Sequence, residues 1–575
     1  MRFPLFLLAS VLSSATLVRA VDSPVIDGLH QDLDRRFIVR PQGLVLDYVN
    51  TDGSIELPKG DEPTLGKPNS LSWWTPLENG PFLSGLYLDG VLMRWQVTKS
   101  PEDARVAREL VQGLLKCASL NDQPAFIARG FYPPENTYYP IGSDDQTAPW
   151  FYGLWKYLQT DLPTAGERKE IEAKILSVAD ALAQNGWKMP CAAIGDMQAG
   201  ETRGEWAGGG YRAVSRRLFA SRIAYEISRD DRWRQDYEAA LTEAVEGSRS
   251  RIDIIEAGID LEWRALPQLA VNHLWIYVIS QAMVAELARL ESDAAVRARY
   301  ETSLQRTAER CAGFVRDSMQ GNLADAKFLT DWRVMNASWR PQTTPKEAVD
   351  LAMEQLKAWG NRGRDLEVIN VREPACAAWI AFYAPKSSDT IAAAASKFGR
   401  FVQAVPWTRL HSSAGIFAES AWYLLNAHVG LGAGLPKAVA EPAAPSNVTV
   451  SRIGQKNQRA TGQFDFAEIP TAFSGYSLYT VPRGASDQPG SGFELRASHD
   501  GRAWLLVMPK GNVEIPEGWE PAGVTIRWKA GDNVFADRVY QRAVKAGETI
   551  VVPPSEGIDN SGTYAIPHAL ILEGK

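Results

Sequence analysis

The chain has 575 residues and a formal net charge of −7, with 45% hydrophobic and 22% charged residues. A chain of this length is too long to fold around one ordinary hydrophobic core, so we expect two or more domains or one large repetitive domain. The charge disfavours nucleic acid as a partner, because an acidic chain offers no basic surface for phosphate groups.

The first 20 residues have the pattern of a secretory signal peptide. One early arginine, Arg2, precedes an apolar run, and small residues precede a Val18-x-Ala20 cleavage site. The run is short and interrupted by Ser and Thr, and no later stretch reaches the ~18 apolar residues of a spanning helix. We therefore expect cleavage after Ala20 and a secreted or periplasmic protein with no membrane partner.

After the signal, the sequence contains a repeated pair of predicted helices. The first helix of each pair is apolar and the second is amphipathic. In the first pair, residues 81–97 are apolar nearly all round, as in a buried helix. Residues 100–120 follow with Ser100 as a suitable N-cap and a single stripe that includes Val106, Leu110 and Leu114. The two stretches therefore predict a helical hairpin.

The pair recurs along the chain, and the first four apolar stretches begin about 60 residues apart, which is typical of stacked helical hairpins. The apolar helices are expected to begin near residues 82, 147, 211, 266, 374 and 412. The later paired stretches are 147–159 with 164–185, 211–228 with 230–247, 266–290 with 292–315, and 374–384 with 387–403, before a last apolar helix over 412–428.

A change of composition separates these helices from the C-terminal part. Residues 429–450 are rich in Gly, Ala and Pro and lack an amphipathic period, which is typical of a linker. Short alternating runs broken by Gly, Pro and Asp-Gly follow, as in a small antiparallel β-sandwich. The predicted organisation is a signal peptide over 1–20, a helical domain over 21–428, a linker over 429–450 and a β module over 451–575.

The segments that lead into the apolar helices combine aromatic and charged residues. In a ring of hairpins these segments share one rim. Sugars suit this combination, because their C–H faces stack on aromatic rings while their hydroxyl and carboxylate groups need polar partners. The alternative is that the tryptophans fill the core and the acids cap helices. The candidate sugar-binding residues are Trp73, Trp74, Arg129, Tyr138, Tyr139, Trp150, Trp206, Arg264, His273, Trp332 and His411.

The repeated hairpins, the Trp-rich loops such as "NSLSWWTPLENGP" over residues 69–81 and the C-terminal β module resemble secreted carbohydrate-active enzymes of the six-hairpin class. That class includes glycoside hydrolases and polysaccharide lyases. The resemblance covers most of residues 30–428 and is architectural, so it assigns no catalytic residue. It implies a mainly α protein, an (α/α)6 toroid followed by the β-sandwich, and an oligo- or polysaccharide substrate.

Glycoside hydrolysis is the first functional hypothesis. It needs a protonated acid and a separate base or nucleophile about 5–10 Å apart. Thr147 or Asp145 can cap the helix that is expected to begin near Pro149. Adjacent residues in irregular backbone usually point apart, so we expect one of Asp144 and Asp145 to be a structural cap and the other to face the substrate. The aromatic residues around them would hold one carboxyl group protonated. The second carboxylate is expected from Glu205 or Glu78, and then from Asp331.

Two alternatives stay open. A polysaccharide lyase acting on uronate-containing glycans by β-elimination needs a carboxylate neutraliser such as Arg129 and a Tyr or His base, for which Tyr138, His273 and His411 qualify. His273 also fits a hydrogen-bonded core position. A non-catalytic glycan-binding protein would need the aromatic loops alone.

No cofactor or metal is predicted. The cysteines, Cys117, Cys191, Cys311 and Cys376, lack the CxxC spacing of a zinc site, and they fit disulfides or buried thiols equally well. Arg216 and Arg217 are interpreted as a solvated or salt-bridged helical pair.

Overall fold

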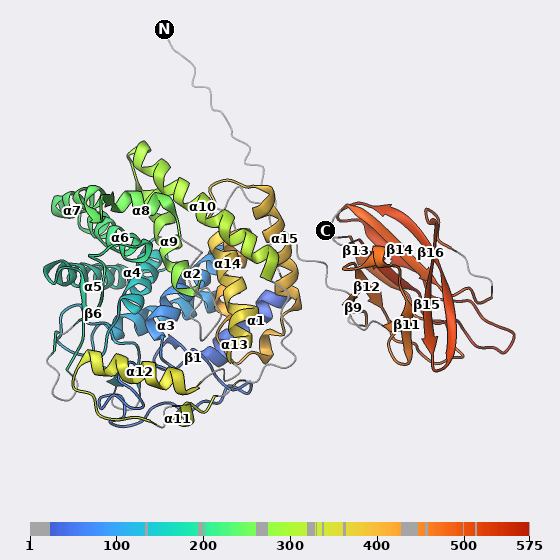
Figure 1. The fold of residues 1–575 in the computed structure, drawn as a ribbon, viewed down its shortest axis with the longest axis horizontal. Helices are drawn as coiled ribbons and strands as arrows, with labels where there is room; N and C mark the ends of the chain where they lie inside the picture. The colour runs from blue at the N-terminus through green and yellow to red at the C-terminus, as the bar shows by residue number, and fades with distance from the viewer. Residues whose placement is uncertain are drawn as a thin grey trace, which may run out of the picture. The chain divides into compact units, whose positions relative to one another are not determined.

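A computed structural model describes residues 23–132, 136–193, 199–200, 202–259, 274–318, 328, 330–335, 338–359, 364–426, 447–454, 458–497, 500–511 and 515–573. The chain divides into two compact units, Met1–Ala438 and Val439–Lys575. The first unit is helical and the second is an antiparallel β structure (Figure 1). This confirms a mainly α protein with a C-terminal β part. The predicted signal peptide and most of the predicted linker lie outside the described residues.

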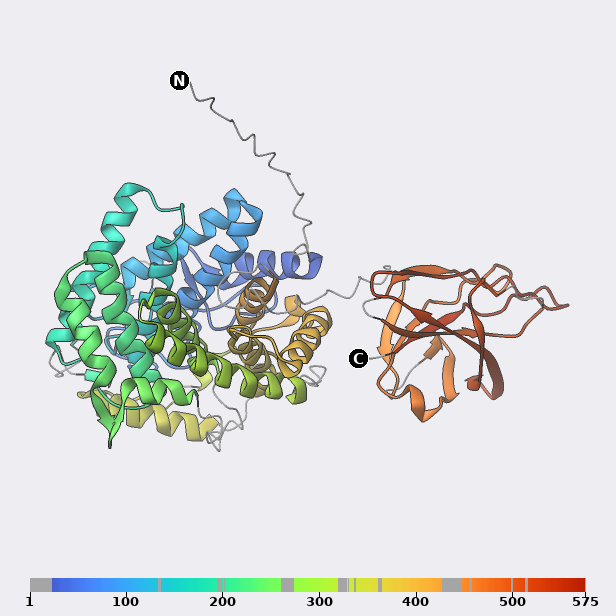
Figure 2. The ribbon, with the colours of Figure 1, turned by 90° about the horizontal axis from the view of Figure 1, so that it is seen from above.

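Six largely buried helices form the centre of the first unit. Each contacts the next in chain order, and α16 contacts α2. Figures 1 and 2 show this unit from two directions at right angles. Most of these helices begin within a few residues of the predicted starts, whereas the predicted start of α9 near residue 266 lies outside the described residues. The bounds are α2 (Gly80–Thr98), α4 (Asp144–Leu158), α6 (Tyr211–Ser228), α9 (Trp275–Leu290), α14 (Glu373–Ala381) and α16 (Gly415–Asn426).

Amphipathic helices cover the central ones. Each packs against a central helix through its apolar stripe. Side-chain caps begin several of them, including Ser100, Asp230, Ser388 and a capping box at Thr164. These helices are α1 (Pro24–Phe37), α3 (Pro101–Cys117), α5 (Ala165–Gln184), α7 (Asp231–Thr242), α10 (Ala294–Ser318) and α15 (Asp389–Ala404).

The sequence analysis missed α1 and several shorter elements. Ser23 caps α1, and Ile26, Leu29 and Leu33 bury its apolar face, so the local signal was present. The other unpredicted helical segments are α8 (Arg251–Ala257), α11 (Trp332–Met335), α12 (Pro345–Trp359), α13 (Arg364–Glu367), the π-helical turn η1 (Val368–Arg372) and the 3-10 turn η2 (Trp407–Arg409). Paired short strands join several helices: β1 (Ile38–Val39) with β2 (Leu44–Val45), β3 (Phe131–Tyr132) with β4 (Thr137–Tyr138), β5 (Lys188–Pro190) with β6 (Thr202–Glu205), and β7 (Ala244–Glu246) with β8 (Arg249–Ser250).

Helices α2 and α4 approach each other closely through two glycines. A Cβ atom on Gly85 would lie 2.1 Å from the carbonyl oxygen of Pro149, and one on Gly153 would lie 2.7 Å from the carbonyl oxygen of Gly85. Pro149 lies inside α4, which begins at Asp144, so the predicted helix start near Pro149 is wrong. The close contact fixes α4 against α2 and so positions the first turn of α4.

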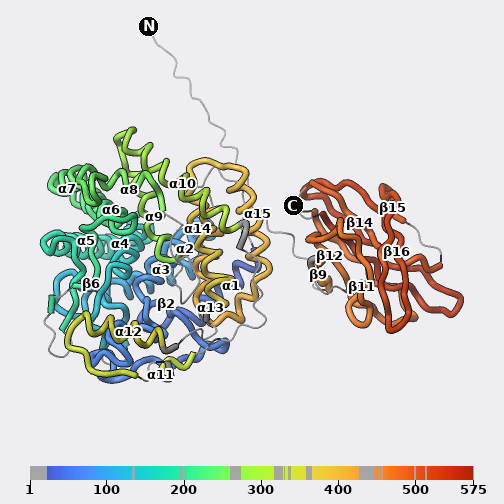
Figure 3. Tube along the Cα trace, in the orientation of Figure 1, coloured from blue at the N-terminus to red at the C-terminus, as the bar shows by residue number. Residues whose placement is uncertain are grey.

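The β unit contains an eight-stranded antiparallel sheet in the order β10-β11-β15-β16-β14-β18-β12-β9. Figure 3 follows the backbone of this unit as a tube. The pair β13 and β17 packs on one face of the sheet, where Leu495 and Ile550 join the apolar cluster that includes Leu505 and Leu570. The strands are β9 (Thr449–Arg452), β10 (Gln458–Ala460), β11 (Phe464–Glu468), β12 (Ser477–Thr480), β13 (Phe493–Arg496), β14 (Gly501–Val507), β15 (Glu520–Ala530), β16 (Asn533–Val544), β17 (Thr549–Val552) and β18 (Ala569–Leu572), with a 3-10 turn η4 (Thr471–Phe473).

Over the described ranges, no helix has the length and apolar character needed to cross a membrane.

Cys117, Cys311 and Cys376 are buried free thiols, and Cys191 is also buried. Burial raises the pKa of the Cys117 and Cys311 thiols.

Candidate functional site

The first turn of α4 carries the paired acids Asp144 and Asp145, with Ser143 at the N-cap position. Two acids in a first turn suit the positive end of the helix dipole. The helix begins at Asp144 because Ser143 is extended and Thr147 returns a side-chain hydrogen bond to the carbonyl oxygen of Ser143. Both aspartates are partly exposed, so solvent reaches this turn.

Asp144 pairs with two arginines from the first turns of α6. The Nη2 atom of Arg212 donates to Asp144 Oδ2 at 3.1 Å, and Nη1 of Arg216 donates to the same oxygen. Strand β6 crosses close to this carboxylate, since a Cβ atom on Gly204 (φ +89°) would lie 2.8 Å from Asp144 Oδ1. Asp144 is therefore held between α6 and β6 as the partner of two guanidinium groups.

Asp145 lies in the field of Arg129 and Arg203. Its Oδ1 atom is 3.8 Å from Arg129 Nη1, and its side chain is 17% exposed. Burial by itself raises a carboxyl pKa, but Arg129, Arg203 and a hydrogen bond from Ser143 outweigh burial and hold the pKa of Asp145 well below its usual range. This direction is opposite to the expectation that the surrounding rings keep a carboxyl group protonated. The sequence did not show that Arg129 and Arg203 lie close to Asp145.

Arg129 joins the loop before α2 to the start of α4. Its guanidinium donates to Ser143 Oγ at 3.0 Å, to Asn79 Oδ1 at 2.9 Å and to the backbone carbonyl oxygen of Glu78 at 2.8 Å. The side chain is 2% exposed. Arg129 therefore positions Asp145 from within the protein, rather than presenting a surface to a sugar as expected from the sequence.

Trp73 and Arg203 lie beside this pair of acids. The guanidinium carbon of Arg203, on β6, is 5.8 Å from the centroid of the Trp73 ring. Trp73 is partly exposed, and Trp74 packs edge-on against it at 6.4 Å between ring centroids. An aromatic ring and a cation are thus placed next to the carboxylates of α4.

Several predicted sugar-binding aromatic residues are buried instead. The Nε1 atom of Trp150 donates to the carbonyl oxygen of Leu114 at 2.8 Å, and the Trp206 ring stacks on Trp187. A ring with no exposed face cannot stack on a sugar, so these rings are core residues in this structure. The buried members of the predicted set are Tyr139, Trp150, Trp206 and Trp332.

The remaining predicted acids occupy different surroundings. Glu78 is partly exposed, and its Oε2 atom accepts a hydrogen bond from the backbone N–H of Trp74. Glu205 is exposed on β6, opposite Lys188 on β5. Asp331 caps α11 by accepting from Val334 N at 3.3 Å.

An open hollow of about 640 Å³ lies beside α11, lined by Asn50, Ile55, Glu56, Thr330, Asp331, Trp332, Arg333 and Val334. In the part of the chain that the structure describes, no hydrogen bond or ion pair joins Asp331 to Asp144 or Asp145.

Tyr138 and His411 are partly exposed, each with its own neighbours. Asn121 donates to the Tyr138 hydroxyl at 2.9 Å. The His411 ring stacks on Phe328 at 5.1 Å, and its Nδ1 atom is 3.1 Å from the carbonyl oxygen of Val49. Arg264 and His273, also predicted as substrate-binding residues, lie outside the described residues.

The sequence analysis did not identify Arg203, Arg212 or Arg216 as site residues. Arg212 and Arg216 are one helical turn apart, so their spacing could have indicated a shared face. Arg216 was expected to be solvated or salt-bridged, and the structure shows it salt-bridged and fully buried. Its neighbour Arg217 pairs with Asp236 and stacks on Trp187, away from Asp144.

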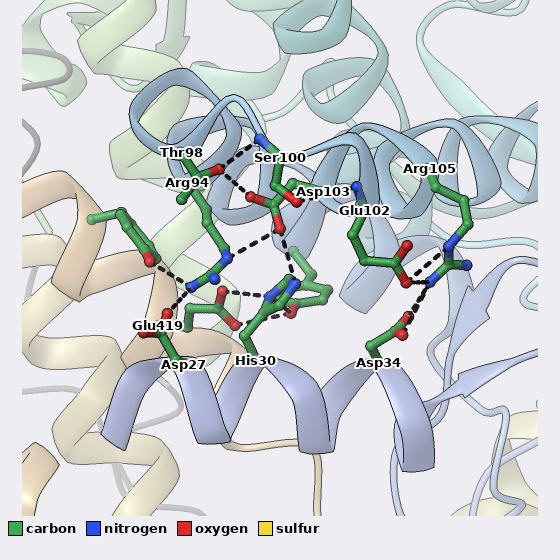
Figure 4. Close-up of polar contacts among 12 residues, drawn as sticks. Asp27, His30, Asp34, Arg94, Thr98, Ser100, Glu102, Asp103, Arg105 and Glu419 are labelled. Carbon is green, nitrogen blue, oxygen red and sulfur yellow. Dashed lines mark hydrogen bonds and ion pairs between the residues drawn. The ribbon is translucent and has the colours of Figure 1, made fainter. Parts of the chain in front are cut away.

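His30 on α1 lies at the centre of a second polar cluster (Figure 4). Its Nδ1 atom is 2.8 Å from Glu419 Oε1, and its Nε2 atom is 3.2 Å from Asp103 Oδ1. Arg94 joins Asp103 to Asp27. Burial disfavours the charged imidazole, but Glu419 and Asp103 raise the pKa of His30 to about 9. Helices α1, α2, α3 and α16 enclose these groups, so we interpret the cluster as structural.

Within the described part of the chain, no group of three or more His, Cys, Asp or Glu side chains is arranged to hold a metal ion. The start of α4 is the candidate site because it combines an ionised carboxylate, an adjoining aromatic ring and several guanidinium groups.

No protein-family model matches the sequence, and no curated protein matches it either. Among solved structures, a β-glucuronidase from glycoside hydrolase family 2 aligns at 14% identity over 23% of this chain, with a TM-score of 0.18. The aligned part spans 14% of that chain. A likeness of this size carries no conclusion about fold or function.

Proposed function

We propose that this chain is an exported glycan-degrading enzyme, most simply a glycoside hydrolase built on an (α/α)6 toroid. The observation that carries the proposal is the placement of Asp145. It is an ionised, partly exposed carboxylate at the start of a central helix, and Arg203, which lowers the pKa of Asp145, also lies against the partly exposed ring of Trp73. An ionised carboxylate supplies one of the two carboxyl groups that glycoside hydrolysis needs, and a neighbouring aromatic ring can stack on a sugar.

The toroid is supported by the succession of contacts among α2, α4, α6, α9, α14 and α16, which returns to its first helix. Export is supported by the N-terminal apolar run and its Val18-x-Ala20 site. In this arrangement the starts of α2, α4 and α6 share one end of the helical unit.

The proposed roles follow from charge and exposure. Asp145 acts as the ionised base or nucleophile. Glu78 is the first candidate for the proton donor, because Arg129 contacts both its backbone and Asp145. Glu205 is the second, since it lies two residues from Arg203 on β6. Asp144 is a structural acid that neutralises Arg212 and Arg216, and Asp331 caps α11.

The test is an activity screen of the mature protein on neutral and acidic polysaccharides, measuring reducing-sugar release alongside the absorbance of unsaturated uronates. Release of reducing sugar without that absorbance supports hydrolysis, whereas the absorbance would show β-elimination and overturn the hydrolase assignment. Asp145→Asn, Glu78→Gln and Glu205→Gln are assayed beside Asp465→Asn, an exposed aspartate of the β unit. Full activity of the Asp145 variant would remove Asp145 from the mechanism.

A further inference from the structure

Three arginines at the candidate site, Arg203, Arg212 and Arg216, each have at least one buried N–H donor without a hydrogen-bond partner among the described residues. Arg216 is fully buried, and only its Nη1 atom reaches Asp144. Among the described residues, its Nε and Nη2 atoms have no hydrogen-bond partner, and the same holds for Nε of Arg212 and Nη1 of Arg203. Buried donors without partners are costly, so a group that satisfied several at once would bind favourably.

The charges at this site are also unbalanced. The carboxylates of Asp144 and Asp145 face the guanidinium groups of Arg129, Arg203 and Arg216, and Asp144 also pairs with Arg212. Burial lowers the pKa of Arg216 to about 10, with Arg212 adding to that effect, and burial and Arg129 lower the pKa of Arg203. These four guanidinium groups therefore outnumber the two aspartate carboxylates that they face.

Solvent reaches one side of this arrangement. The side chains of Arg212 and Asp144 are 31% and 21% exposed. Trp73, beside Arg203, also has an exposed part. Solvent therefore reaches the edge of the arginine cluster at Arg212 and part of the Trp73 ring next to Arg203.

On the basis of the proposed function, we propose that Arg203, Arg212 and Arg216 form a subsite for an acidic sugar whose ring lies on Trp73. The anionic group is the carboxylate of a uronic acid residue or a sulfate ester, both of which accept several hydrogen bonds from guanidinium groups. The subsite is selective, because a neutral sugar leaves the buried donors unpaired, and a site built around buried polar groups rejects ligands that cannot pair them.

The test uses isothermal titration of the full-length mature protein with D-glucuronate, D-glucose 6-sulfate and D-glucose. We expect one of the two acidic sugars to bind at least about tenfold more tightly than glucose, as charge-assisted hydrogen bonds require. The tighter of the two identifies the anionic group. Equal affinity for all three sugars would overturn the subsite.

We expect the variants Arg203→Gln and Arg212→Gln each to weaken the binding of acidic sugars about tenfold. Their affinity for glucose should stay the same as that of the unaltered protein. Both side chains are partly exposed, so these variants avoid the folding defect that removal of the buried Arg216 side chain would bring. Arg299→Gln, on α10, is the matched control, because its partners are Asp253 and Glu256. Unchanged binding of acidic sugars in both site variants would overturn the proposal.

The two proposals fail separately. Cleavage of a neutral glycan without preferential binding of either acidic sugar would leave the hydrolase assignment standing and remove the subsite. Preferential binding of glucuronate without cleavage of any glycan would keep the subsite and remove the enzymatic function.

Discussion

The Nη1 atom of Arg129 lies 3.8 Å from Oδ1 of Asp145, and the same guanidinium group also donates hydrogen bonds to Ser143 and Asn79. Asp145 is therefore fixed in its ionised form by a buried cation that is itself anchored by neutral partners. An acid held in this way is suited to act as a base or nucleophile and unsuited to donate a proton.

Asp145→Asn should lower kcat by about 10² to 10⁴, the range by which an acid–base group contributes. The amide keeps the size of the side chain, so we expect a small change in melting temperature. Steady-state kinetics and thermal unfolding are measured together, with Asp465→Asn as the control. Activity equal to that of the unaltered protein would contradict the proposed role.

Asp144→Asn should affect stability more than chemistry. It removes the charged partner of Arg216, which is fully buried, and an unpaired buried charge costs on the order of 3 kcal/mol. Urea unfolding of Asp144→Asn, Arg216→Gln and the double variant measures the coupling between the two residues. A loss below about 1 kcal/mol in each single variant, with additive effects, would show that this ion pair contributes little.

His30 predicts a pH dependence of stability. Its pKa is raised to about 9 in the folded protein, above the unfolded value of about 6.5, so its stabilising contribution is fully present below pH 6.5 and is lost as the pH rises through 9. The free energy of unfolding should therefore fall by on the order of 3 kcal/mol across this interval. Denaturant unfolding at several pH values tests this, and His30→Gln should remove that part of the dependence. An identical pH profile in the variant would rule out His30 as its source.

Gly85→Ala should destabilise the helical unit by about 1–3 kcal/mol, because the added Cβ atom would overlap the backbone of Pro149. Gly313→Ala is the matched control on α10, where no atom lies within 4 Å of the added group. That variant should be neutral or stabilised by up to about 1 kcal/mol, since alanine favours helix. Denaturant unfolding of both proteins gives the comparison, and an unaffected Gly85 variant would mean that α2 and α4 can separate at little cost.

The sequence by itself determined most of the central helices. The apolar and amphipathic periods are local properties, so α2, α4, α6, α14 and α16 begin close to the predicted residues. It also separated the helical part from the β part, because alternating runs with Gly and Asp-Gly breaks are local as well. The start of α4 was expected near residue 147 from the apolar stretch and near Pro149 from the capping residues, and it lies at Asp144. Proline is common in the first turn of a helix, whereas Pro149 lies deeper inside α4.

Only the tertiary structure decided which rings are exposed and which charges meet. Trp73 is partly exposed and Trp150 is buried, although both are tryptophans in aromatic segments near predicted helix starts. Arg216 is 72 residues from Asp144 in sequence, and their contact depends on how α4 and α6 pack. The protonation state of an acid depends on such distant charges and on burial, neither of which a local pattern encodes. The sequence therefore supplied Asp144 and Asp145 as candidates, and the packing of α4, α6 and β6 separated their roles.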